Sequence, residues 1–135
     1  LGLNPEENMD YHFSKTLAMP FDQAIERVTE ELKNEGFGVL TEIDVKATLK
    51  KKIDVDFRPY RILGACNPGF AHKALQAEPE IGTMLPCNVI VQEVDDGIMV
   101  SAIDPMASMQ AVDNAGLAEV ATQVQSLLKG AIEAL

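Results

Sequence analysis

The segment from Cys87 to Ile103 constrains the fold more than any other part of the chain. It contains two apolar runs, at 87–94 and 98–103, with Asp-Asp-Gly at 95–97 between them. An Asp-Gly pair between two apolar runs is one of the strongest short-range signals for a β-hairpin. The sequence therefore predicts two neighbouring antiparallel strands in this part of the chain.

Three more segments have the pattern of strands. In residues 11–17 large and polar side chains alternate, which predicts that Tyr11, Phe13 and Leu17 share one face. The other two segments are short and lie between turn-forming residues, as strands commonly do. These two predicted strands are 38–43 and 60–65.

Two long segments have helical periodicity instead. Apolar residues recur every three or four positions from Phe21 to Leu32, which predicts a helix with one buried stripe that ends near Gly36. A second and longer apolar stripe runs from Leu117 to Leu135. Each stripe is wide enough to cover part of a sheet, so both helices are expected to pack on one.

The excursion from residue 66 to residue 86 is predicted to hold a shorter helix. Residues 69–77 fit two helical turns, and a loop bounded by prolines follows at 78–86. A second loop is expected at 106–116, where small residues and methionine predominate. The residues expected on the inward face of the short helix are Phe70, Ala71, Ala74 and Leu75.

The segment 44–57 is compatible with one further helix. Val45, Leu49 and Ile53 have helical spacing, and Asp44 is placed to cap the N-terminus. The three lysines at 50–52 form either an anion-binding patch or a solvated face balanced by nearby aspartates. A solvated face is the simpler interpretation.

Together these elements predict an α+β fold on a mainly antiparallel sheet. Placing both long helices on one face of the sheet is the economical packing for this order of elements. The opposite face then meets either water or a second copy of the chain. The length of 135 residues suits one domain, so we expect a single α+β domain over 9–135 and an extension or added residues over 1–8.

The charge of the chain limits its partners. The formal net charge is −10, and from Glu93 onward there are seven acidic residues but only one basic residue, Lys129. Such a surface repels phosphate backbones, so no nucleic acid is expected as a partner. No apolar run reaches the ~18 residues of a membrane span, and the first ten residues do not resemble a secretory signal. We therefore expect no membrane association and a cytoplasmic location.

Both cysteines lie beside an asparagine, at the junction of a predicted strand. Cys-Asn-Pro at 66–68 follows one strand, and Pro-Cys-Asn at 86–88 opens another. If these strands are antiparallel neighbours, the end of one lies beside the start of the other, and the two thiols meet at one edge of the sheet. We therefore predict a ligand-binding site at this edge, formed by Cys66, Asn67, Pro68, His72, Pro86, Cys87 and Asn88.

Four roles for Cys66 and Cys87 remain open from the sequence. The thiols can pack as small buried residues, or one can be a catalytic or redox thiolate whose pKa a nearby helix N-terminus or basic side chain lowers. They can also hold a soft metal ion together with His72, although the paired spacing of structural zinc sites is absent. A disulfide is disfavoured if the compartment is reducing.

Three stretches resemble one known family. They are Leu-Gly-Ala-Cys-Asn-Pro at 63–68, the segment 71–91, and Ser-Ala-Ile-Asp-Pro at 101–105. Over residues 11–135 the chain is similar to the domain of unknown function 302 family. This resemblance implies a TATA-binding-protein-like α+β fold, ordered as a strand, a helix, a four-stranded meander and a helix. It also implies a homodimer, and it brings no assigned activity.

The functional prediction is a small dimeric domain that binds a small ligand or a metal ion around Cys66 and Cys87. One alternative is a thiol-dependent enzyme or redox protein that uses these cysteines, and another is a non-catalytic protein-interaction module. The sequence lacks the glycine-rich loops that bind dinucleotides or phosphates, and it lacks a nucleophile elbow. No cofactor is therefore assigned.

Overall fold

The computed structural model of the protein describes residues 10–135, so Met9 and the predicted extension at 1–8 lie outside the described residues. An antiparallel five-stranded sheet has the order β1-β5-β4-β3-β2. The strands are β1 (His12–Leu17), β2 (Gly38–Asp44), β3 (Tyr60–Cys66), β4 (Cys87–Val94) and β5 (Gly97–Ile103). Because β2 to β5 are neighbours both in sequence and in space, they form the expected meander.

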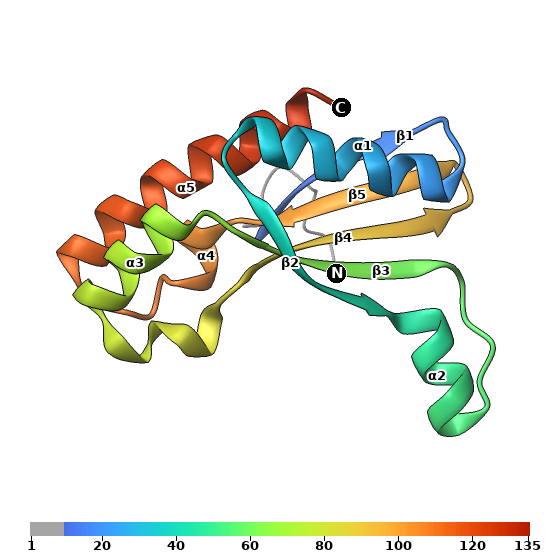
Figure 1. Cartoon of the computed structure of the whole chain (residues 1–135), viewed down its shortest axis with the longest axis horizontal. Helices are drawn as coiled ribbons and strands as arrows, with labels where there is room; N and C mark the ends of the chain where they lie inside the picture. The colour runs from blue at the N-terminus through green and yellow to red at the C-terminus, as the bar shows by residue number, and fades with distance from the viewer. Residues whose placement is uncertain (1–9) are drawn as a thin grey trace, which may run out of the picture.

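Helices connect and cover these strands (Figure 1). They are α1 (Phe21–Asn34), α2 (Val45–Ile53), α3 (Pro68–Ala77), α4 (Pro105–Ser108) and α5 (Ala115–Glu133), with a 3₁₀ helix η1 (Pro79–Met84). The long helices α1 and α5 lie over the same face of the sheet, which confirms the predicted α+β architecture. Within residues 10–135, none of the helices combines the length and hydrophobicity that crossing a bilayer requires.

The core lies between the sheet and these two helices. Side chains alternate along each strand, so Leu63, Val89 and Val100 all point toward the helices, and none is more than 1% exposed. The predicted apolar stripes of both helices meet them there. The helical residues buried in this core include Ala24, Val28 and Leu32 of α1 and Val124, Leu128 and Ala131 of α5.

The predicted hairpin joins β4 to β5. Val94 pairs with Gly97, so only Asp95 and Asp96 lie between the two strands. Gly97 has a φ of +141°, and a Cβ at this position would lie 2.5 Å from the carbonyl oxygen of Leu17. The turn therefore needs glycine both for its backbone conformation and for the close approach of β1.

Two segments predicted to be loops contain short helices instead. The helix α4 overlaps the start of 106–116, and η1 occupies most of 78–86. Each begins with a proline, whose missing N–H costs nothing in a first helical turn. Asp104 also caps α4, because its Oδ1 accepts a hydrogen bond from the Met106 N–H at 2.9 Å. The loop prediction was wrong because helices of four to six residues are too short to show a periodic pattern.

The segment after β2 forms the helix α2, which projects from the rest of the domain (Figure 1). Asp44 caps it as predicted, by accepting a hydrogen bond from the Ala47 N–H at 2.9 Å. Its lysines are solvated, and Lys50 Nζ lies 2.8 Å from Asp54 Oδ1 and 3.3 Å from Asp56 Oδ1. No residue of α2 is buried.

Apolar side chains are exposed along the edge strand β2 and beyond α2. We name this set the β2–α2 surface, and it consists of Leu40, Ile43, Ile53 and Val55. Their exposed fractions are 69%, 48%, 62% and 41%, in that order. Within residues 10–135, β2 is an edge strand, so its outer backbone groups have no neighbouring strand there.

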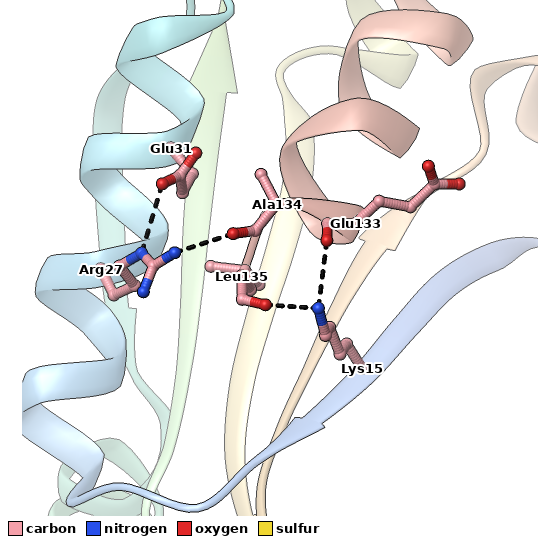
Figure 2. Close-up of polar contacts among 6 residues, drawn as sticks. All are labelled: Lys15, Arg27, Glu31, Glu133, Ala134 and Leu135. Carbon is pink, nitrogen blue, oxygen red and sulfur yellow. Dashed lines mark hydrogen bonds and ion pairs between the residues drawn. The ribbon is translucent and has the colours of Figure 1, made fainter.

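Two basic side chains hold the C-terminal end of α5 against the rest of the core (Figure 2). Lys15 of β1 donates hydrogen bonds to the carbonyl of Glu133, at 3.1 Å, and to that of Leu135. Arg27 of α1 donates to the carbonyl of Ala134 at 2.7 Å and pairs with Glu31 at 3.2 Å. Carbonyls that a helix end leaves unpaired are thereby satisfied by cations, which also complement the helix dipole.

Candidate functional site

The structure brings the two cysteines together at one end of neighbouring strands, as predicted. Cys87 at the start of β4 is paired with Ala65, the residue before Cys66 on β3. Both thiols are free, and Cys66 is half-buried while Cys87 is only 8% exposed. The antiparallel register, and not proximity in the sequence, therefore creates this pair.

Both cysteines line a cavity of about 320 Å³ between this end of the sheet and helices α3 and α5. The inward face of α3 forms one wall, and all four residues predicted for it contribute to the lining. The opposite wall comes from α5 and from the segment around α4. Large apolar side chains that line the cavity include Phe37, Phe70, Leu85, Met109, Val120 and Val124.

Four of the seven predicted site residues line this cavity, namely Cys66, Asn67, Pro86 and Cys87. The other three, Pro68, His72 and Asn88, are exposed and lie outside its lining.

Asn67 has a structural role beside the cavity. Its Oδ1 accepts a hydrogen bond from the Phe70 N–H at 3.3 Å, which caps the N-terminus of α3. Its Nδ2 fits against Gly36, where a Cβ would lie 2.9 Å away and where φ is +86°. Asn67 thus joins α3 to the turn between α1 and β2 and fixes the position of the N-terminus of α3.

Sequence reasoning missed the part of the wall that α5 and the α4 segment supply. Val120, Ala121 and Val124 were recognisable as one apolar stripe, but such a stripe predicts only burial. Pro105 and Met109 lay in a segment expected to be a loop. Placing these two residues opposite α3 would have required predicting the short helix at Pro105–Ser108.

The geometry gives little support to a metal site. Among residues 10–135, no three His, Cys, Asp or Glu side chains are grouped closely enough to hold a metal ion. His72, the proposed third ligand, is exposed on α3 and does not line the cavity. Cys66 and Cys87 thus share the cavity without the imidazole that was expected to join them.

Burial raises the pKa of the Cys87 thiol to about 11, and the neighbouring Cys66 adds a smaller effect in the same direction. At pH 8 only ~0.1% of Cys87 is then the nucleophilic thiolate, since each pH unit below the pKa reduces that fraction tenfold. Cys87 is therefore a neutral thiol at physiological pH.

Cys87 is expected to react slowly with a thiol reagent, at a rate that rises about tenfold per pH unit between pH 7 and pH 9. The rate is measured in a Cys66→Ser variant, which keeps the burial that is the main cause of the shift. A Cys87→Ser variant supplies the comparison rate for the half-buried Cys66. A Cys87 rate that levels off within this range would contradict the raised pKa.

The fold and site define a small α+β domain with helices on one face of its sheet and an apolar cavity at one end. The chain belongs to the family described as domain of unknown function DUF302, which matches residues 13–135. It is similar to a solved structure described as an uncharacterized conserved protein DUF302 from Bacillus stearothermophilus, with 29% identity and a TM-score of 0.85. That match covers 91% of this chain and 96% of the other. No curated protein matches the chain.

Proposed function

We propose that this domain binds a small molecule in the cavity beside Cys66 and Cys87. The observation that supports this function is an apolar, partly open cavity of about 320 Å³ in a domain of this size. Protein interiors are normally close-packed, and small-molecule pockets have volumes of about 300 to 1,000 Å³. The cavity is walled by α3, α5, the α4 segment and the sheet, and it opens to solvent beside Leu40 and Leu75.

Binding is favoured over thiol chemistry at Cys87 because the cavity does not activate that thiol. A nucleophilic cysteine needs a nearby positive charge or a similar cause to lower its pKa, whereas the pKa of Cys87 is raised. No lysine, arginine or histidine lines the cavity among the described residues. Cys66 directly precedes Asn67, the cap of α3, and is the better candidate if a thiol-dependent step exists.

The function is tested by filling the cavity with Ala71→Phe. Ala71 is half-buried in the cavity wall, so a phenylalanine ring there is expected to occupy space that a ligand needs. The uncharged fluorescent reporter N-phenyl-1-naphthylamine is expected to bind the wild-type protein, and the variant about tenfold more weakly or worse. The measurement is a fluorescence titration.

The matched control for this titration is Ala118→Phe, since Ala118 is exposed on α5 and does not line the cavity. It is expected to keep the wild-type affinity. Circular dichroism of both variants checks that the fold is retained. Reporter binding that is absent from the wild type, or equal in all three proteins, would disprove the proposed site.

We also propose that the protein is a homodimer that associates through the β2–α2 surface. A second copy would cover apolar side chains that α2 and the edge strand leave in water. The four lysines of α2 locally offset the net charge of −10, which reduces the repulsion between two copies at this surface. We also propose a cytoplasmic location, because two free thiols are compatible with a reducing compartment.

The dimer is tested with Ile43→Asp, which puts a charge in the middle of the β2–α2 surface. The wild type is expected to sediment as a dimer at micromolar concentrations, and the variant as a monomer, because burying an unpaired carboxylate is costly. Met84→Asp is the control, since Met84 is 38% exposed in η1 and lies outside this surface. A monomeric wild type, or dimers of both variants, would rule out this interface.

A further inference from the structure

The lining of the cavity restricts the chemistry of its ligand. None of the described residues that line it is charged at neutral pH. An ionised group moved into such a space loses its hydration and gains no partner, which is strongly unfavourable. A carboxylate or phosphate inside the cavity is therefore disfavoured.

The lining offers a ligand few polar side chains. Asn67 uses its Oδ1 to cap α3, and its Nδ2 lies against Gly36. Thr41 packs closely over Gly64, where a Cβ would come within 2.1 Å of its Oγ1. The two thiols are the remaining polar groups, and thiols are weak hydrogen-bonding partners. Most of the ligand surface must then contact hydrocarbon.

The rim of the cavity is apolar as well. Leu40 and Leu75 belong to the lining, yet they are 69% and 41% exposed, so they lie where the cavity meets solvent. A cation lies beside the lining. Lys73 Nζ is 5.5 Å from the centre of the Phe70 ring. Lys73 does not itself line the cavity, so an anionic ligand could reach it only from outside.

We infer that the cavity takes an uncharged, largely aliphatic molecule, such as a medium-chain alcohol. The volume of about 320 Å³ lies within the range of small-molecule pockets, about 300 to 1,000 Å³. This inference rests on the proposed binding function and adds to it the class of ligand. Cys66 and Cys87 act here as parts of the wall.

The experiment compares two ligands that have the same chain and differ in charge. 1-Decanol and decanoate each compete with N-phenyl-1-naphthylamine for the wild-type protein at pH 8, where decanoate is ionised. Decanol is expected to displace the reporter at a concentration about tenfold lower or less than decanoate does. A Lys73→Ala variant is titrated in the same way, and the preference for decanol is expected to persist in it.

The outcomes separate the ligand class from the proposed function. If the reporter binds the wild type but not Ala71→Phe, and decanoate then competes as well as decanol, the site stands and the inferred class is wrong. Equal potency of the two ligands in Lys73→Ala would also overturn the class, because a lining that excludes charge must prefer decanol most when the nearby cation is absent. If the reporter binds neither protein, the proposed function itself fails.

Discussion

Gly64→Ala is expected to lower the free energy of unfolding by about 3 kcal/mol, near the upper end of what overpacking a well-packed site usually costs. A Cβ on Gly64 would lie 2.1 Å from Thr41 Oγ1 and 2.7 Å from Pro86 Cγ. Thr41 can rotate away, but the proline ring cannot. Because Thr41 and Pro86 both line the cavity, the substitution should also distort the proposed site.

Two variants control for this result, which is measured by urea denaturation. Gly38→Ala is the matched substitution on the neighbouring strand, where a Cβ would meet nothing within 4 Å, and it is expected to be neutral. Adding Thr41→Ala to Gly64→Ala removes one of the two clashes and should recover part of the loss. Equal stabilities of Gly64→Ala and Gly38→Ala would contradict the close packing described here.

Leu128→Ala is expected to cost about 3 to 4 kcal/mol, within the range for large-to-small substitutions in cores. Leu128 lies on α5, is 0% exposed and belongs to the main core between the helices and the sheet. Removing its side chain leaves a cavity that the surrounding side chains of the helices and the sheet cannot easily fill.

The neighbouring Leu127 gives a control with the same chemical change. Leu127 is only partly buried against the same core, so Leu127→Ala should cost clearly less, about 1 to 2 kcal/mol. Both variants are compared with the wild type by urea denaturation, with the slope of the transition checked for two-state behaviour. A loss at Leu127 as large as that at Leu128 would show that α5 is packed in another orientation.

Hydrophobic periodicity was enough to predict most of the fold. The alternation in β1, the stripe from Phe21 to Leu32 and the Asp-Gly turn after β4 each specify local structure through one simple physical rule. The helix stripes also require a common apolar surface, which places α1 and α5 on the sheet. The closeness of Cys66 and Cys87 then follows from two strands being antiparallel neighbours.

The cavity could not be predicted in this way. A stripe such as Val120, Ala121 and Val124 has the same sequence pattern whether it contacts a neighbouring helix or faces an open space. That difference depends on how far α3 stands from α5, and η1 and α4 help to set this distance. Tyr11 shows a related limit, because it shares the alternation of β1 but lies before the strand and is 64% exposed.

The pairing of β1 with β5 bears on the order in which the protein folds. Ser14 Oγ and Ser101 Oγ lie 2.7 Å apart although 87 positions separate them in the chain. Closing so long a loop costs more entropy than joining consecutive strands, and such non-local contacts form late. The hydrogen bond from Lys15, on the same strand, to the Glu133 carbonyl also requires that the end of α5 is already in place. β1, although synthesised before the other four strands, is therefore expected to join the sheet after them.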